Sequence, residues 1–246
     1  MIHNFLISIN SLRKKLNPEI IEVAWESHGT KSWRREMYAD YKPSKGVDDA
    51  FIYQFNSIQL LLYLLKVKQY YAPKNEADDV LAGLNNNELN VIFTKDKDIF
   101  QIVDETTHIY DGKKIYKLKD AIEKFGVQPR YIADLLAIAG DTSDNIIGLN
   151  GYGPKKAEKV IKSYGTIENW IKNENFTEET KKLLRINKKL TTLNSNCKPI
   201  ELKFNTEETD ISILEDYGLN RLKDKIHEIR LLGKKKPKGG NLHDFF

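Results

Sequence analysis

Three short acidic clusters, each beside an apolar segment, limit most strongly how this chain can fold. "EADDV" places Glu76, Asp78 and Asp79 directly before apolar residues, "TKDKD" follows the apolar run "LNVIF", and "GDTSD" follows "IADLLAIAG". Alone, each cluster is typical of a helix start, a solvated turn or a capped helix end. Together they favour a fold that brings them to one sheet edge, because ligand sites gather at the carboxyl ends of parallel strands.

Carboxylates that converge in this way repel one another unless cations neutralise them. The clusters contain no histidine or cysteine, and hard oxygen ligands of this kind suit Mg²⁺ or Mn²⁺ rather than zinc. Several carboxylates can hold two such ions about 4 Å apart, which is the arrangement used for phosphodiester hydrolysis. The candidate ligands in the three clusters are Glu76, Asp78, Asp79, Asp96, Asp98, Asp141 and Asp144.

The apolar pattern along the chain predicts an α/β fold. Helical spacing is expected over residues 2–16 and from about 49 to 68, and "EIIEVAW" and "LNVIF" are typical of short buried strands. "THIYDGKKIYKL" predicts a hairpin about Asp111-Gly112. Because helix and strand alternate here, we expect a mostly parallel central sheet covered by helices.

The pattern changes at Pro129, after which it is almost wholly helical. The expected organisation therefore has three parts. They are an α/β core over residues 1–128, a helical region over residues 129–232, and a flexible tail over residues 233–246.

Composition narrows the class of protein. A chain of 246 residues with 40% hydrophobic and 30% charged residues is typical of a soluble globular protein, and its longest apolar run, "LLLYLL", is far too short to cross a bilayer. A single cysteine, Cys197, excludes an internal disulfide and fits a reducing compartment, so we expect a cytoplasmic protein without a membrane partner. The net charge of +4 permits a polyanionic partner.

A glycine-rich stretch, "GLNGYGPKK", follows the third acidic cluster. Gly148, Gly151 and Gly153 allow tight turns and expose backbone N–H groups. Lys155 and Lys156 fall in the first turn of the helix that the following proline begins. Backbone donors, a helix N-terminus and lysines together predict a phosphate cradle. The alternative is a glycine-rich connector between helices.

These motifs resemble the signature blocks of a known family. "EADDV", "TKDKDIFQIV" and "GDTSDNIIGLNGYGPKKA" resemble, in order and approximate separation, blocks of the 5′ nuclease family, which includes the 5′–3′ exonuclease domain of bacterial DNA polymerase I, phage flap endonucleases and phage-type ribonuclease H. "WRREMYADYK" resembles the basic segment before the family's helical arch, here about residues 30–68. The third block is the most diagnostic, because it resembles the family's helix–three-turn–helix DNA clamp. The resemblance extends from Met1 to about residue 200.

The resemblance implies a metal-binding role for two groups of carboxylates, with two Mg²⁺ or Mn²⁺ ions as cofactors. It also implies that carbonyls of the glycine loop hold K⁺. The first group comprises Glu76, Asp78 and Asp79, with Glu26, and the second comprises Asp96, Asp98, Asp141 and Asp144.

The resemblance also implies roles toward nucleic acid. Lys42 and Arg34 would face the scissile phosphate and supply positive charge where negative charge develops. Tyr41 would stack on an unpaired base, although packing inside the protein is the alternative. The other residues expected to bind nucleic acid are Lys45, Lys155, Lys156, Gly148, Gly151 and Gly153.

The sequence departs from the family pattern at two places. The family normally begins with a strand that carries an aspartate, whereas this sequence starts at Met1 inside the expected first helix. Glu26 stands where the family usually has aspartate, which moves the charge by one methylene. Three explanations stay open: another polypeptide supplies the strand, translation starts upstream, or the chain is a decayed nuclease that binds DNA and cuts poorly. The other acidic positions are intact, which favours activity.

The expected function is a metal-dependent 5′–3′ exonuclease or flap endonuclease. It would hydrolyse phosphodiester bonds of branched or 5′-ended DNA, or of an RNA–DNA hybrid, in replication or repair, and act as a monomer unless a second chain supplies the missing strand. A catalytically silent clamp for DNA junctions is one alternative. A PIN-type ribonuclease is another, against which the helical half and its glycine loop argue.

The tail "KKKPKGGNLHDFF" carries a separate expectation. Leu242, Phe245 and Phe246 follow a segment that is not expected to pack. They either fold back on the protein's own surface or bind a partner. "LHDFF" resembles the C-terminal peptides by which replication enzymes bind sliding clamps, although Gly239 stands where such peptides usually have glutamine.

Overall fold

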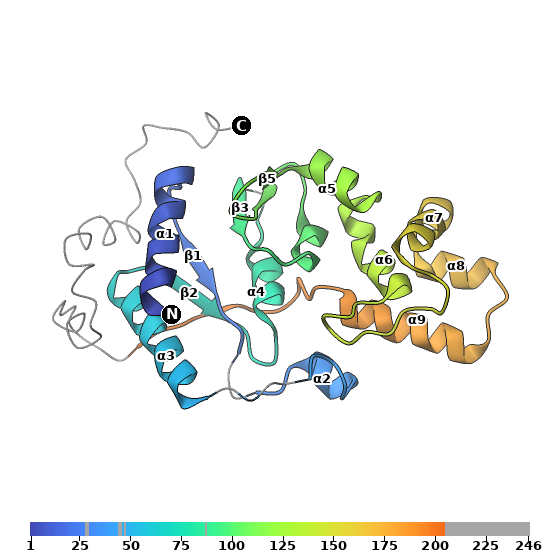
Figure 1. Cartoon of the computed structure of the whole chain (residues 1–246), viewed down its shortest axis with the longest axis horizontal. Helices are drawn as coiled ribbons and strands as arrows, with labels where there is room; N and C mark the ends of the chain where they lie inside the picture. The colour runs from blue at the N-terminus through green and yellow to red at the C-terminus, as the bar shows by residue number, and fades with distance from the viewer. Residues whose placement is uncertain (28–29, 44–45, 47, 87, 205–246) are drawn as a thin grey trace. The chain divides into compact units, whose positions relative to one another are not determined.

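The computed structural model describes residues 1–27, 30–43, 46, 48–86 and 88–204. These residues form two compact units, both drawn in Figure 1. Unit 1 contains the described residues of Met1–Trp25, Lys45–Tyr71 and Ile200–Phe246, and unit 2 contains those of Glu26–Ser44 and Ala72–Pro199.

Unit 1 combines a small sheet with two helices. Its strand order is β1-β2-β6, with β1 parallel to β2 and β2 antiparallel to β6. The core gathers around Trp25, whose indole N–H donates to Gln69 Oε1 at 2.9 Å. The elements are α1 (Ile2–Leu16), β1 (Glu22–Ala24), α3 (Asp49–Leu64), β2 (Lys68–Tyr71) and β6 (Ile200–Glu201).

Unit 2 contains a second three-stranded sheet and most of the helices. Its strand order is β3-β4-β5, with β3 parallel to β4 and β4 antiparallel to β5. The strands are β3 (Asn90–Phe93), β4 (Thr107–Tyr110) and β5 (Ile115–Tyr116). The helices are α2 (Trp33–Met37), α4 (Ala77–Leu84), η1 (Asp98–Ile102), α5 (Leu118–Phe125), η2 (Pro129–Tyr131), α6 (Ile132–Ala139), α7 (Pro154–Tyr164), α8 (Ile167–Asn173) and α9 (Glu178–Thr191).

The helices α6 to α9 pack together in the yellow-green to orange part of Figure 1. α6 is apolar nearly all round and almost fully buried, as a central helix must be. Its one acidic residue, Asp134, accepts from the Ile167 N–H at 2.9 Å and from Lys188 Nζ at 2.8 Å. These bonds tie the start of α8 and the last turn of α9 to α6, so the buried charge is both paired and hydrogen-bonded.

The α/β fold class is confirmed, and so is the hairpin about Asp111-Gly112. Asp111 Oδ1 accepts from the N–H groups of Lys113 and Lys114, and Gly112 has a positive φ of 98° that this turn requires. The sheet differs from the expectation of one mostly parallel sheet. The described strands form two three-stranded sheets, each with one parallel and one antiparallel pair, because the hairpin reverses β5 and β6 returns antiparallel to β2. None of the helices in the described part of the chain has both the length and the apolar character to span a membrane.

Candidate functional site

Three aspartates of unit 2 come together as a candidate cation site. Asp98 begins η1 just after β3, and Asp141 and Asp144 lie on the loop that follows α6. One carboxylate oxygen from each lies within 4.8 Å of the other two. Asp98 Oδ1 is buried and has no hydrogen-bond partner among the described residues. An all-carboxylate set with an unsatisfied oxygen fits a hard divalent cation.

The electrostatics of this group reflect an excess of negative charge. Burial, followed by the charges of Asp96 and Asp141, raises the pKa of Asp98 to about 8. Burial also raises the pKa of Asp144. The pKa of Asp141 is lowered although burial opposes this, because Ser143 Oγ donates to it at 2.5 Å and Lys97 Nζ lies 2.9 Å away.

The loop after α6 is fixed by backbone contacts. Asp141 and Ile146 exchange two backbone hydrogen bonds of 2.8 Å, which closes the loop that carries two of the three aspartates. At Gly148 the chain passes so close to α6 that an added Cβ would lie 2.4 Å from the Ala139 carbonyl oxygen. Gly148 is therefore required for this close approach, and these backbone contacts hold the loop that carries the two aspartates.

The first acidic cluster supplies a second group of carboxylates, beside a pocket that Asp98 also lines. Glu76 is the N-cap residue of α4, and Asp78 lies in its first turn. Burial, followed by the charge of Asp96, raises the pKa of Asp78 to about 7. The pocket is lined by Arg34, Tyr41, Lys42, Glu76, Asp78, Asp98, Leu190, Thr191 and Leu193.

Asp79 and Arg34 form a buried ion pair, and Arg34 also lines the pocket. Arg34 Nη1 and Nη2 donate to the two carboxylate oxygens at 2.6 and 2.8 Å, and the exposed fractions of the two residues are 3% and 0%. The Asn194 N–H also donates to Asp79 at 2.8 Å. These bonds hold the pKa of Asp79 below its usual range although burial opposes this. A planar guanidinium matches a carboxylate at both oxygens, so the two side chains are paired with each other in this structure, and their expected roles at a metal and at a phosphate stay predictions.

Tyr41 is also placed differently from the expected base-stacking role. Its exposed fraction is 2%, and its ring packs with Ile146 and Leu190. Its hydroxyl donates to Asp144 Oδ2 at 2.8 Å and lies 3.3 Å from Glu76 Oε2. A ring buried in this way has no free face for a base, so the packing alternative describes this structure.

Lys42 contacts the two groups of carboxylates. Its Nζ lies 2.8 Å from Glu76 Oε2 and 3.5 Å from Asp144 Oδ1, and these charges raise its pKa although burial opposes this. The side chain is half-exposed at the pocket, which Arg34 also lines, so the structure brings both expected cations to the pocket.

Lys97 was missed by the sequence reasoning. It lies between Asp96 and Asp98, and its Nζ pairs with Asp141 Oδ2 at 2.9 Å. The available signal was its position inside "TKDKD", because a side chain on that turn must lie near the carboxylates that the turn presents. The sequence reasoning also missed Ser143, whose hydroxyl donates a hydrogen bond to Asp141 within the same loop.

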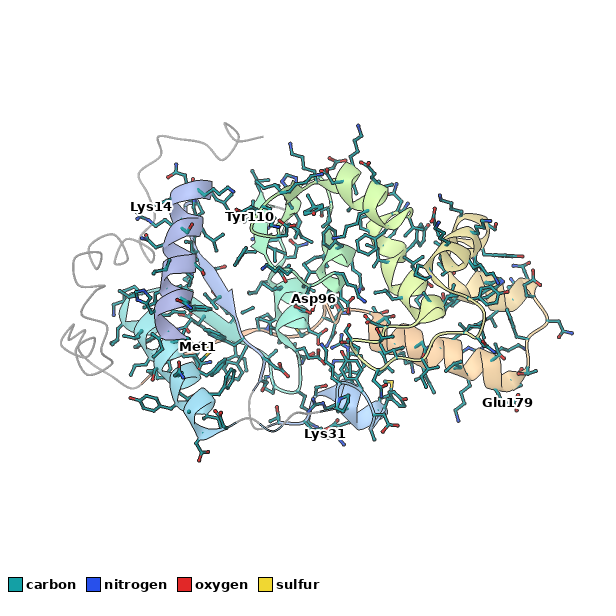
Figure 2. All side chains as sticks on the ribbon, viewed as in Figure 1. Met1, Lys14, Lys31, Asp96, Tyr110 and Glu179 are labelled. Carbon is teal, nitrogen blue, oxygen red and sulfur yellow. The ribbon has the colours of Figure 1, made fainter. Side chains whose placement is uncertain are left out.

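Other predicted residues lie at the edge of the site or away from it. Asp96, labelled in Figure 2, is exposed on the loop after β3, and its Oδ1 accepts from the Asp98 N–H at 3.0 Å. Glu26 is exposed and, within the part of the chain that the structure describes, joins neither the three-aspartate group nor the pocket lining. Lys155 and Lys156 are exposed in the first turn of α7, after the N-cap residue Gly153. Lys45, Leu242, Phe245 and Phe246 lie outside the described residues.

An acidic pocket on an α/β unit, with a glycine loop leading into packed helices, fits the metal-dependent nuclease expected from the sequence motifs. Comparison with protein families agrees. Residues 1–126 match the family "5′-3′ exonuclease, N-terminal resolvase-like domain", and residues 127–216 match "5′-3′ exonuclease, C-terminal SAM fold". The chain therefore belongs to the 5′–3′ exonuclease family, and the resemblance stated from its motifs is confirmed.

Individual relatives support the same family assignment. The chain is 34% identical to the 5′-3′ exonuclease of Aquifex aeolicus, over 94% of this chain and 82% of that protein. It is 30% identical to DNA polymerase I of Lactococcus lactis, over 82% of this chain but 25% of the polymerase, so it spans about a quarter of the polymerase's length.

Solved structures share the fold. A mutant of the bacteriophage T5 5′-exonuclease matches with a TM-score of 0.63 and 20% identity, over 93% of this chain and 92% of the other. The bacteriophage T5 flap endonuclease, in a complex described as containing DNA and metal ions, matches with a TM-score of 0.63 and 21% identity, over 93% and 90%. These likenesses concern the fold.

Proposed function

We propose that this nuclease is a metal-dependent 5′–3′ exonuclease and flap endonuclease that uses two Mg²⁺ or Mn²⁺ ions. Its substrates are branched or 5′-ended DNA, or an RNA–DNA hybrid, in replication or repair. The observation that carries the proposal is the three-aspartate group with its unsatisfied buried oxygen, beside a pocket lined by Glu76 and Asp78.

The residues divide into two ligand groups. Asp98, Asp141 and Asp144 would hold one ion, and Glu76 and Asp78 the other, with Asp96 acting from the exposed loop. When bound, such ions lower the pKa of coordinated water and neutralise phosphate charge. The mutual repulsion of these carboxylates supports the proposal. Bound protons and nearby lysines neutralise part of their negative charge, and a divalent cation would neutralise it more fully.

The chain's own cations have distinct tasks in this proposal. Lys42 is poised at the pocket between Glu76 and Asp144, where its ammonium can stabilise charge that develops on a scissile phosphate. Lys155 and Lys156, exposed at the start of α7, would bind phosphates of the duplex. K⁺ on carbonyls of the glycine loop belongs to the same proposal.

The proposal also covers the location of the protein, its oligomeric state and a partner. The chain would work in the cytoplasm as a monomer. The tail residues Leu242, Phe245 and Phe246, which lie outside the described residues, would bind a sliding clamp. Deleting residues 241–246 should then spare cleavage of short oligonucleotides and abolish stimulation by the clamp, since tethering raises local concentration without new catalytic contacts. A deletion that lowered the melting temperature by several degrees would make the tail structural.

Digestion of a 5′-labelled flap duplex tests the proposal. We expect cleavage with Mg²⁺ or Mn²⁺ and none in excess EDTA. Asp98→Asn removes a charged ligand while keeping its size, so cleavage should fall by orders of magnitude while the melting temperature is kept. Glu123→Gln, at an exposed position of α5, is the control and should cleave like the wild type. Cleavage in excess EDTA, or full activity of Asp98→Asn, would refute the metal-dependent mechanism.

A further inference from the structure

Tyr41 and Lys42 are neighbours in sequence that face the same two carboxylates. Tyr41 Oη lies 2.8 Å from Asp144 Oδ2 and 3.3 Å from Glu76 Oε2. Lys42 Nζ lies 2.8 Å from Glu76 Oε2 and 3.5 Å from Asp144 Oδ1. Glu76 caps α4 and Asp144 lies on the loop after α6, so this dipeptide joins the two proposed ligand groups.

The tyrosine hydroxyl can donate a full hydrogen bond to only one carboxylate at a time. A phenol has a single proton to donate, and the shorter contact assigns that proton to Asp144. The ring that carries the hydroxyl is buried against Ile146 and Leu190, so packing restricts its movement. A donor on a buried ring fixes the orientation of the carboxylate that accepts from it, whereas the Lys42 ammonium lies at the end of a half-exposed, flexible side chain.

Other hydrogen bonds also join the loop that carries Tyr41 and Lys42 to the loop that carries Asp144. The Lys42 N–H donates to the Asp144 carbonyl at 3.1 Å, and Asn145 Nδ2 donates to the Asp40 carbonyl at 2.9 Å. Lys42 and Asn145 both have left-handed backbones, with φ of 42° and 57°. Removing the Tyr41 hydroxyl therefore leaves the two loops joined and removes its short bond to Asp144 and its longer contact with Glu76.

We propose that Tyr41 is a positioning residue whose hydroxyl holds the Asp144 carboxylate in the orientation that lets it share a cation with Asp98 and Asp141. This inference rests on the proposed metal-dependent function. Hydrogen bonds to ligating carboxylates orient them, and losing such a bond typically lowers metal affinity by roughly 10- to 100-fold. Tyr41 would thus act on the reaction through Asp144, without touching DNA.

Tyr41→Phe distinguishes this role from stacking on a base. The substitution keeps the ring and its packing and removes only the hydroxyl. If Tyr41 stacked on DNA, Tyr41→Phe would behave like the wild type, and only Tyr41→Ala would weaken binding of substrates with an unpaired 5′ arm. Tyr38→Phe is the matched control, because Tyr38 packs against the same cluster from the same segment.

The test is calorimetric titration of Mn²⁺ into the full chain, without DNA. We expect Tyr41→Phe to bind at least one Mn²⁺ about 10-fold more weakly than the wild type, and Tyr38→Phe to match the wild type. In cleavage assays the half-saturating Mn²⁺ concentration of Tyr41→Phe should rise by the same factor. Saturating Mn²⁺ should restore its turnover, with KM for DNA unchanged.

Two results would overturn the inference in different ways. A wild type that binds Mn²⁺ and a Tyr41→Phe variant that binds it equally well would refute the positioning role and leave the proposed function intact. A wild type that binds no Mn²⁺ would refute the proposed function and this inference with it. Equal melting temperatures in EDTA exclude misfolding as the cause of weaker binding.

Discussion

At the scale of single residues, two carboxyls of the pocket have pKa values near neutrality. Burial, then the charge of Asp96, raises the pKa of Asp78 to about 7, and burial, then the charges of Asp96 and Asp141, raises that of Asp98 to about 8. In an unfolded chain both pKa values would be about 3.9. Between the unfolded pKa of about 3.9 and the folded pKa of about 7 or 8, the folded protein therefore binds more protons than the unfolded chain. Its stability is lost as the pH rises through this range.

We accordingly expect the melting temperature in EDTA to fall from about pH 4 to about pH 8 and to level off above it. Asp98→Asn cannot titrate at this position and should show a weaker fall. Mg²⁺ should remove most of the fall, because ligands must be deprotonated to bind it and its affinity rises with pH. Differential scanning calorimetry over this range measures all three. A melting temperature in EDTA that rose with pH would contradict the assignment of these shifts.

At the scale of elements, Arg34 connects three helices of unit 2. It belongs to α2, pairs with Asp79 of α4, and donates through Nε to the Leu190 carbonyl of α9 at 2.8 Å. Its Nη2 also donates to the Thr192 carbonyl at 3.0 Å. This buried guanidinium holds the segment that leads to Lys42 against the start of α4.

Removing one member of this pair should be costly. Arg34→Ala leaves the Asp79 carboxylate buried without its partner, and we expect a loss of about 3–5 kcal/mol of stability. Arg34→Lys keeps the charge but loses the paired geometry, so it should fall between the wild type and Arg34→Ala. Urea unfolding monitored by circular dichroism measures both. If Arg34→Ala proved as stable as the wild type and only bound DNA more weakly, Arg34 would face the phosphate as first expected from the sequence.

The elements show how far the sequence could predict the structure. Periodicity located α1, because side-chain spacing reports local geometry directly, and the turn signal Asp111-Gly112 located the hairpin. It did not find the short strand β6, whose pairing with β2 depends on residues far away in the chain. The acidic motifs identified the carboxylates, but not the contacts that each of them makes. Asp79 differs from Asp78 through partners at 34 and 194, and Tyr41 differs from an exposed aromatic through packing on residues 146 and 190.

The start of α7 carries a prediction about nucleic-acid binding. Lys155→Ala combined with Lys156→Ala should weaken duplex binding and reduce the salt-dependence slope by about 0.9 for each phosphate that the protein no longer neutralises. Both lysines are exposed, so the melting temperature should be unchanged. The paired control is Lys113→Ala with Lys119→Ala, two exposed lysines of the hairpin and α5. Binding measured by fluorescence anisotropy at several salt concentrations tests this, and equal slopes for the two double variants would remove the lysines from the interface.

At the scale of the whole molecule, the chain passes between its two units more than once, while the candidate site is built within one of them. Unit 1 takes its described residues from three separate parts of the sequence. The proposed ligands Glu76, Asp78, Asp98, Asp141 and Asp144 all belong to unit 2. A cation bound there stabilises the folded state of the unit that supplies its ligands.

This separation predicts where a cation protects the backbone. In hydrogen exchange measured by mass spectrometry, adding Mg²⁺ should slow exchange in the unit 2 peptides around Glu76 and over residues 141–146, because opening those segments now requires the ion to dissociate. Peptides over β1 and β2 of unit 1 should exchange at unchanged rates if the units open independently. Asp98→Asn should abolish the protection, which ties it to the three-aspartate group. Equal protection of β1 and β2 would show instead that the two units open as one cooperative body, with the site governing the stability of the entire fold.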